Sequence, residues 1–477
     1  MHFNPERQYE CATVLKQVLS EKMESADIVK MVRAIKDQRK RNPPDTRNLK
    51  HAFRYLDEGF VLTNSIEIGD ATEYCVDRYL NYDEQFKGCY GFSITTFFDV
   101  MNKIFNIAYE RMRNEAEKGS ILNTAIYSDG EAPDLGVIKK PPKEYIEAWK
   151  RVYILNKSEL SEDRLKTNFF VENYSFRSTE QINEDFRFQN NPILDLDEDT
   201  IVIAFPYLLI RALPSRLGDM LSASKEYNDL KGKDFEPLVF ELLRKIKTGK
   251  LQVNKRYGPD GNYEVDGILE FDESIWFVEC KSRPPSEGTH KGKMRYIRRD
   301  LERTVLDAEE QAKRANDYIQ EFGLMNYEKK KIGALIILDG LYPQLNENVW
   351  NEKIEWKYDI PKVVMNYFEL KDLFRQENFD EMGKYLNWRT KKNPIVCLDE
   401  KDYWVWFTYL QKYPENQVLV DQALASGSII ITGSQFEQKD LPERLEILEK
   451  AKNQKVVIAI GAFSGKKTLS ALRDKQR

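Results

Sequence analysis

Three charged residues interrupt an apolar stretch near the middle of the chain, and their types suit metal-assisted hydrolysis. Asp266 lies in one apolar run, "EVDGILEF", and Glu279 and Lys281 end the next run, "SIWFVECK". Carboxylate oxygens, with water and a substrate phosphate, are the ligands that Mg²⁺ prefers. A neighbouring ammonium could orient the attacking water or stabilise charge on a phosphate. Asp266, Glu279 and Lys281 are therefore the candidate catalytic residues.

A β-hairpin would bring these residues together. Its turn should fall at "FDES", with Asp272 and Glu273 at the tip, because acids and Ser are common between apolar runs. A two- or four-residue loop centred there sets three opposed pairs: Asp266 with Glu279, Ile268 with Phe277, and Glu264 with Lys281. Strand alternation places Phe277, Glu279 and Lys281 on one face. An odd-length loop or a bulge would shift this register.

Opposed carboxylates repel each other by on the order of 3 kcal/mol at about 5 Å and an effective dielectric near 20. The arrangement becomes reasonable if a divalent cation or a proton lies between them. Alternatively, Glu279 and Lys281 form the exposed face of an edge strand, with Lys281 paired to Glu264. Against this, the second run is apolar on both faces up to Glu279. That pattern predicts a strand buried on both sides, where unused charges are costly.

The segments around the hairpin predict an α/β (α+β) fold with a mixed sheet flanked by helices. "KGKDFEPLVFELLRKI" (231–246) has apolar residues at helical spacing, and a second helical face runs from Ile297 to Ile319. Residues 330–340 suit a buried strand, and residues 362–376 read as strand then helix. The order helix, three strands, helix, strand is typical of such a sheet.

The spacing of Asp266, twelve residues and then Glu279-Cys280-Lys281 resembles the active-site motif of the PD-(D/E)xK nuclease superfamily. The helix "GKDFEPLVFELL" resembles the first helix of its Mrr-type and resolvase-like branches, where a glutamate often joins the metal site. Glu236 takes that position. Val265 replaces the proline of the motif name. The resemblance covers residues about 225–345, and it implies a restriction-endonuclease-like core that hydrolyses DNA phosphodiester bonds.

On this resemblance, Asp266 and Glu279 bind Mg²⁺ or Mn²⁺, with the Cys280 backbone carbonyl as a further ligand. Lys281 positions or polarises the attacking water, and Glu236 supports the metal or the base. Basic residues that begin the following helix would hold the DNA backbone, which brings affinity but little sequence information. These residues are Lys291, Lys293, Arg295, Arg298 and Arg299.

Plainer interpretations remain open for several of these residues. Glu236 is equally explained as a solvated residue near a helix N-terminus. Each basic residue is equally explained as part of a solvated helix face, although residues 281–303 hold eight Lys or Arg against three Asp or Glu. Gln311 resembles a glutamine of some branches, but its loose spacing favours a position on the helix surface.

The chain is too long, at 477 residues, for one compact core. We expect a helix-rich N-terminal domain (1–190), a connecting segment (191–224), the nuclease-like domain (225–384) and a small C-terminal α/β domain (385–477). Within the connecting segment, residues 200–213 favour a buried strand and helix. "GAFSGKKTL" (461–469) has the wrong glycine spacing for a phosphate loop and favours a strand-to-helix turn. "KDQRKRNPPDTRN" (36–48) favours a helix end and a solvated loop.

Composition narrows the classes of protein. Hydrophobic residues make up 41% and charged residues 32%, which is typical of a soluble globular chain. No apolar run reaches 18 residues and no secretory signal is visible, so we expect a cytoplasmic protein without a membrane partner. Five scattered cysteines and three histidines show no zinc or disulfide spacing. The net charge of −5 leaves room for local basic patches.

These observations favour a metal-dependent DNA endonuclease, plausibly of bacterial restriction or anti-phage defence. Cleavage of both strands by one site per chain would require a homo-oligomer, a dimer or larger. The alternative is a catalytically inactive nuclease-fold protein that binds nucleic acid or acts as a sensor. A scaffold that assembles through its N-terminal helices is a third hypothesis. Intact Asp266, Glu279 and Lys281 favour the first, because a decayed site usually loses one of them.

Overall fold

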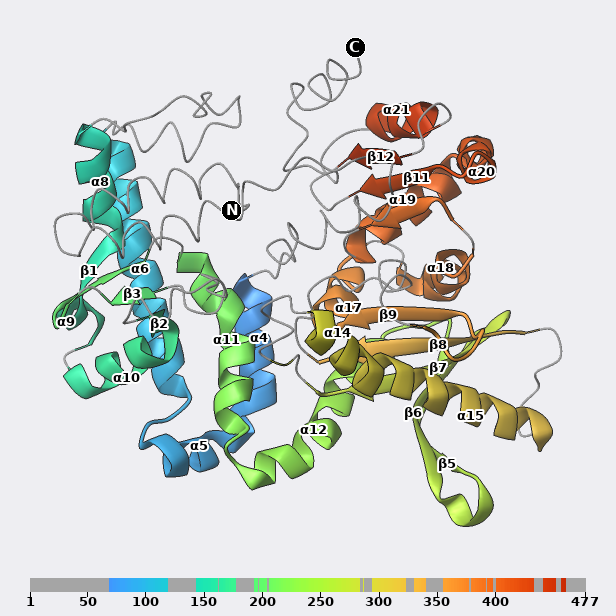
Figure 1. The fold of residues 1–477 in the computed structure, drawn as a ribbon, viewed down its shortest axis with the longest axis horizontal. Helices are drawn as coiled ribbons and strands as arrows, with labels where there is room; N and C mark the ends of the chain where they lie inside the picture. Colours follow the sequence, from blue (N-terminus) through green and yellow to red (C-terminus); the bar gives the residue numbers. More distant parts are fainter. Residues whose placement is uncertain are drawn as a thin grey trace. The chain divides into compact units, whose positions relative to one another are not determined.

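The computed structural model (Figure 1) describes residues 68–118, 143–161, 163–176, 193–195, 197–203, 206–283, 286, 294–322, 330–339, 355–376, 379–391, 393–397, 400–432, 441–451 and 456–459. The chain divides into two compact units, residues 1–42 with 65–229 and residues 43–64 with 230–477. The expected loop at 36–48 and the expected turn at 461–469 lie outside the described residues. Across the described ranges, no helix is long and apolar enough to cross a membrane.

The first unit combines helices with a small four-stranded sheet. Its elements are α4 (Ile68–Tyr79), α5 (Asp83–Tyr90), α6 (Thr95–Glu117), α8 (Lys143–Tyr153), β1 (Ile154–Asn156), α9 (Lys157–Leu160), α10 (Arg164–Tyr174), β2 (Ser175–Phe176), β3 (Ile193–Asp195), β4 (Thr200–Val202) and α11 (Pro206–Leu221). The strand order is β1-β4-β3-β2. The strand and helix expected at 200–213 are confirmed as β4 and α11. Strands β1 and β2 were not expected, because three and two residues are too few to show alternation.

The second unit contains the five-stranded sheet that carries the candidate residues. Its elements are α12 (Lys225–Leu243), β5 (Lys250–Tyr257), β6 (Tyr263–Glu270), β7 (Ser274–Lys281), α14 (Met294–Leu301), α15 (Asp307–Glu321), β8 (Lys331–Leu338), β9 (Lys362–Asn366), α17 (Tyr367–Leu373), α18 (Met382–Arg389), β10 (Ile395–Cys397), α19 (Glu400–Lys412), α20 (Gln417–Ala425), β11 (Ile429–Thr432), α21 (Leu441–Ala451) and β12 (Val456–Ala459). Helix α12 begins in the first unit and ends in the second.

The expected mixed sheet flanked by helices is confirmed. Its strand order is β5-β6-β7-β8-β9, with antiparallel pairing from β5 to β7 and parallel pairing from β7 to β9. A separate three-stranded sheet, β10-β11-β12, is parallel. The long helix expected between 297 and 319 is confirmed: α14 and α15 form one continuous helical segment, joined by a π-helical turn at Glu302–Leu306.

The hairpin between β6 and β7 has the predicted turn and register. The Phe271 N–H donates to the Ser274 carbonyl at 2.8 Å, which leaves Asp272 and Glu273 as a two-residue loop. The ladder runs from Glu270–Ile275 to Gly267–Val278 and includes Ile268–Phe277. It stops there, one position before Asp266 would pair with Glu279. The predicted pair of Glu264 and Lys281 is wrong, because Glu264 instead lies 3.4 Å from Arg256 of β5.

Strand β6 changes direction at Asp266. The ladder between β5 and β6 skips Asp266 and its partner Asn254, and Asn254 has a φ of 51°. Val265 and Ile268 would face opposite sides of a regular strand, yet both belong to the core beneath α15. Irregularities of this kind re-aim a side chain and end pairing. The outer half of the β5–β6 hairpin therefore separates from β7 at the candidate residues, and in Figure 1 it extends away from the other strands.

Helices pack on both faces of this sheet. Helix α15 contributes an alanine-rich face to the core, and that face lies against Phe277 of β7 and Ile336 of β8. On the other face α12 approaches closely, since a Cβ on Gly267 would lie 3.0 Å from the Phe240 ring. Burial on both faces explains why β7 is apolar along nearly its whole length.

Gly333 of β8 tests this packing, because it is the register partner of Trp276 in β7. A Cβ at Gly333 would lie 2.4 Å from the ring of Trp276, which is fully buried. We expect Gly333→Ala to lower the free energy of unfolding by about 1–3 kcal/mol, as overpacking does. The measurement is urea denaturation followed by circular dichroism.

Gly232→Ala is the matched control for this substitution. Gly232 lies inside α12, and a Cβ added there would contact only Ser282 Oγ, at 3.6 Å. Alanine favours a helix interior by roughly 0.5–1 kcal/mol over glycine, so this variant should be as stable as the parent or more so. Equal stability of the two variants would contradict the close contact of β8 with Trp276.

Candidate active site

The candidate site forms where β6 leaves β7. Asp266 is the last residue of β6 before the ladder with β7 begins, and its Oδ2 accepts a hydrogen bond from the Cys280 N–H at 2.7 Å. This side-chain hydrogen bond continues the contact between the strands where backbone pairing ends. It also keeps the Asp266 carboxylate close enough for its charge to act on Glu279, although the predicted Asp266–Glu279 pair is absent from the ladder.

Glu279 carries its carboxylate into the interior. The residue is 1% exposed, because β6 and β8 flank β7 and helices cover both faces. Its Oε2 accepts from Lys281 Nζ at 3.1 Å, whereas its buried Oε1 has no hydrogen-bond partner among the described residues. The pKa of Glu279 is raised to about 8, chiefly by burial; Lys281 opposes this shift, and the charges of Asp266 and Glu236 add to it. The edge-strand interpretation of Glu279 is therefore wrong.

A third carboxylate reaches the same place from α12. Burial, and then the charges of Asp266 and Glu264, raise the pKa of Glu236 to about 7. Burial also raises the pKa of Asp266, although the Cys280 N–H opposes this shift. Glu236 is therefore electrostatically coupled to the hairpin residues. Glu236 is half-buried and lies well inside α12, so the alternative of a solvated residue near a helix N-terminus describes it only in part.

Lys281 links the hairpin to α15. Besides Glu279, its ammonium donates to Gln311 Oε1. Gln311 was expected on the helix surface, and that expectation is wrong: α15 lies along the sheet and directs this amide at the end of β7. The glutamine of the resemblance was a usable signal, but the loose spacing had argued against it. Gln311 fixes one donor direction of Lys281, since its amide oxygen can only accept.

The carboxylate oxygens of the site match in part the ligands that a divalent cation such as Mg²⁺ prefers. Within the described ranges, no three His, Cys, Asp or Glu side chains converge as a ready-made metal site. Asp266 and Glu279 nevertheless fit a cation held by two carboxylates, because Glu279 Oε1 is buried and unpaired. Positive charge there would stabilise the ionised form of these acids, whose pKa is raised first by burial and then by their mutual repulsion. The side chain of Cys280 is buried, so Cys280 takes part in the site through its backbone, whose N–H donates to Asp266.

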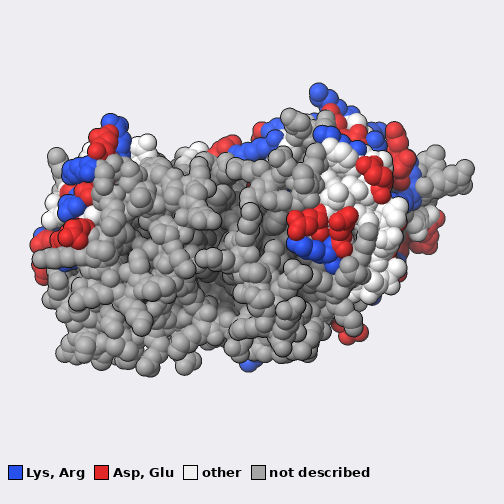
Figure 2. All heavy atoms as spheres, turned by 90° about the horizontal axis from the view of Figure 1, so that it is seen from above, with Lys and Arg blue, Asp and Glu red and all other residues white. Residues whose placement is uncertain are grey.

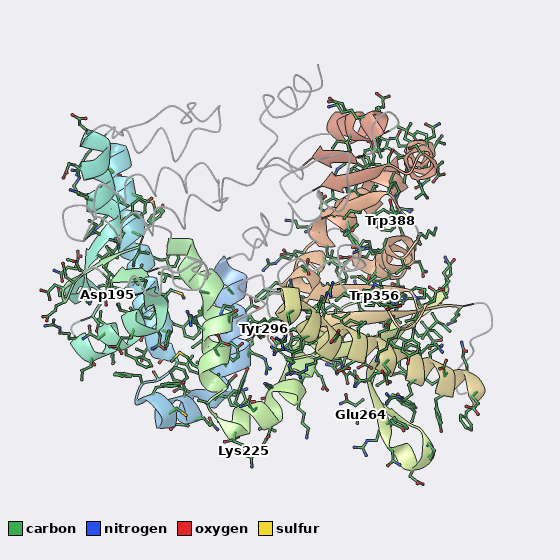
Figure 3. All side chains as sticks on the ribbon, in the orientation of Figure 1. Asp195, Lys225, Glu264, Tyr296, Trp356 and Trp388 are labelled. Carbon is green, nitrogen blue, oxygen red and sulfur yellow. The ribbon has the colours of Figure 1, made fainter. Side chains whose placement is uncertain are left out.

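The basic residues expected to bind a phosphate backbone divide into two sets. Arg295 and Arg298 are exposed on α14. Arg299 is partly buried, with its guanidinium 4.8 Å from the ring centre of Tyr296 and 3.4 Å from Asp300 (Tyr296 is labelled in Figure 3). Lys291 and Lys293 lie outside the described residues. On α14, Arg295 and Arg298 are therefore the basic residues that form no ion pair with a described acid.

The buried Glu279 carboxyl makes stability depend on pH. Its pKa is about 8 in the folded chain against an ordinary 4.5, so stability is full below about pH 4.5 and falls as pH rises to 8. Glu279→Gln removes this loss. In EDTA we expect the variant to gain unfolding free energy over the parent, from little at pH 5 to on the order of 2–3 kcal/mol at pH 8. Urea titrations across this range measure it.

Glu273→Gln, in the exposed hairpin turn, is the matched control. It should change the unfolding free energy little at every pH. A gain for Glu279→Gln that is the same at pH 5 and pH 8 would show that Glu279 is ionised in the folded chain. EDTA matters because a bound cation would stabilise the ionised carboxylate and hide the effect.

Comparison with known proteins identifies no relative of this chain. Neither protein-family models, nor curated proteins, nor solved structures give a match to the chain. The roles of Asp266, Glu279, Lys281, Glu236 and Gln311 therefore rest on their own arrangement, namely three coupled carboxylates and an ammonium held by an amide.

Proposed function

We propose that the second unit is a metal-dependent nuclease of the PD-(D/E)xK superfamily, with a restriction-endonuclease-like core. The observation that carries the proposal is the buried Glu279 carboxylate, with its unpaired Oε1, beside Asp266 and Lys281. A hairpin gains no stability from such a group, whereas a hydrolytic site uses it. The order α12, β5-β6-β7, α14 and α15, β8 supports the fold, because it matches the core order of that superfamily.

Each residue has a role in the proposed hydrolysis. Asp266 and Glu279 would hold Mg²⁺ or Mn²⁺, with the Cys280 carbonyl as a further ligand. The bound cation supplies positive charge that polarises the phosphate and acidifies water. Lys281, fixed by Gln311, positions the attacking water against the scissile phosphate. Glu236, with a pKa of about 7, is suited to accept the proton of that water near neutral pH.

The proposed substrate is DNA, and the proposed setting is bacterial restriction or anti-phage defence in the cytoplasm. Two observations support a polyanionic substrate: the exposed Arg295 and Arg298 of α14, and the lysine beside the carboxylates. A chain with one such site cuts one strand at a time. Cleavage of both strands would require a homo-oligomer, so that two sites act on one duplex.

The alternative is a catalytically inactive nuclease-fold protein that binds nucleic acid or senses a signal. Two contacts favour it: the Lys281 ammonium already pairs with Glu279, and Asp266 accepts a hydrogen bond from the Cys280 N–H. On this alternative the acids and the lysine neutralise one another and no cation enters. The two hypotheses differ in their dependence on divalent cations.

Cleavage of plasmid DNA tests the proposed activity. The purified full chain should nick or linearise plasmid in Mg²⁺ or Mn²⁺ and not in EDTA. Lys281→Ala should slow cleavage by at least about 100-fold, the usual loss when a positioned acid–base group is removed. Lys331→Ala, which removes an exposed lysine at the start of β8, should cleave at the parental rate. Equal rates for the two variants, or cleavage that persists in EDTA, would refute the proposal.

Thermal unfolding tests the cation site independently of cleavage. Mn²⁺ at about 100 times its dissociation constant should stabilise the parent by about 2.7 kcal/mol, because it binds only the folded chain. Asp266→Asn combined with Glu279→Gln should abolish this increase. Glu273→Gln should respond as the parent does. A Mn²⁺ response that survives the double substitution would place the cation elsewhere and favour the inactive alternative.

A further inference from the structure

A second basic segment lies before the site in sequence, from the residues that follow α12 into β5. We call it the basic edge and define it as Arg244, Lys245, Lys247, Lys250, Lys255 and Arg256. All six residues are exposed, and no acidic residue occurs between 244 and 256. The whole chain has 78 acidic and 73 basic residues, so this one-sign segment departs from the average composition.

The basic edge leads to the carboxylates. Strand β5 is the outermost strand of the five-stranded sheet and pairs with β6, which carries Asp266. Asn254 of β5 lies at the register position of Asp266, and Lys255 follows it directly. At about 3.3 Å per residue, Lys250 is about 13 Å along the strand from this point. The edge thus runs from beside the site towards the end of α12.

Most of these six basic residues have no counter-ion among the described residues. Of the six, only Arg256 forms an ion pair there, with Glu264 at 3.4 Å (Glu264 is labelled in Figure 3). Glu270 is the register partner of Lys250, but its carboxylate pairs with Lys330 at 2.7 Å. Asp380 accepts a hydrogen bond from the Lys247 backbone N–H, and no described acid forms an ion pair with the Lys247 ammonium. The lysines of the edge are therefore available to an external anion.

Protection of a sheet edge explains only part of this pattern. Lysines on an outer strand do block pairing with other chains, which would account for Lys250 and Lys255. Arg244, Lys245 and Lys247 precede the strand and have no such role. Where Figure 2 draws described side chains, basic and acidic residues instead occur in mixed groups, as is usual for a protein surface.

We propose that the basic edge holds the phosphate backbone of duplex DNA on one side of the scissile bond. This inference rests on the proposed nuclease function. A duplex is favoured over a single strand because single-strand sites combine basic grooves with aromatic rings that stack on bases, and residues 244–256 contain no aromatic residue. The eight residues of β5 span about 26 Å, or roughly eight base pairs at 3.4 Å each.

Binding at increasing salt tests the basic edge without cleavage. Fluorescence anisotropy in EDTA compares the full chain with a triple variant, Lys245→Ala, Lys247→Ala and Lys250→Ala, on a duplex of about 30 base pairs. We expect affinity to fall at least tenfold at 100 mM salt, and the slope of log affinity against log salt to fall by about 2–3. The corresponding Lys→Arg triple should restore both, which separates charge from misfolding.

Lys384→Ala, Lys391→Ala and Lys412→Ala together form the matched control, since these exposed lysines belong to the same unit but not to the edge. Parental affinity is expected for this control. Duplex affinity and slope in the edge variant equal to those of the control would overturn the inference. So would an effect of equal size on a single strand, or tighter edge-dependent binding of duplex RNA than of duplex DNA.

Failure of this inference and failure of the proposed function are distinguishable. If plasmid is cleaved and the edge variant binds duplex as the control does, the nuclease stands and the basic edge is refuted. If plasmid stays intact in every divalent cation while the edge variant loses duplex affinity, catalysis is refuted. The basic edge would then belong to an inactive DNA-binding protein.

Discussion

The buried carboxylate of Glu279 is the constraint around which the second unit is arranged. Removing an ion from water costs several kcal/mol even after the protein relaxes. The structure offsets this cost with the Lys281 ammonium on one oxygen and leaves the other oxygen unpaired. Without a further partner, the buried carboxyl group favours its protonated form, and its pKa is accordingly raised to about 8. A divalent cation would offset the same cost without a proton.

The architecture of the sheet produces this burial. Strand β7 lies in the interior of the sheet between β6 and β8, and helices pack on both faces, so a side chain near its end has little access to water. Backbone pairing of β6 with β7 begins only after Asp266, and the ladder of β6 with β5 skips the same residue opposite Asn254, which adopts a positive φ. The backbone irregularity and the carboxylates thus belong to one structural feature.

Charges are separated along the same strands. Three coupled carboxylates would repel a phosphate, so an approaching polyanion needs compensating positive charge close by. Lys281 provides it within the site, and the basic edge provides it along β5. Strong exposed charge of one sign also raises the rate of encounter with DNA and makes binding dependent on salt. The acidic centre and the basic edge are complementary parts of the proposed nuclease.

The sequence by itself determined the hairpin: turn residues and period-two alternation set the Ile268–Phe277 register and the mixed sheet. These signals are local, and local signals survive in a single sequence. Tertiary structure alone decided where pairing ends, that Gln311 holds Lys281, and that Glu236 is coupled to Asp266. Helix packing sets those contacts between distant residues, and the sequence indicated Glu236 and Gln311 only through the resemblance of their helices to a nuclease superfamily.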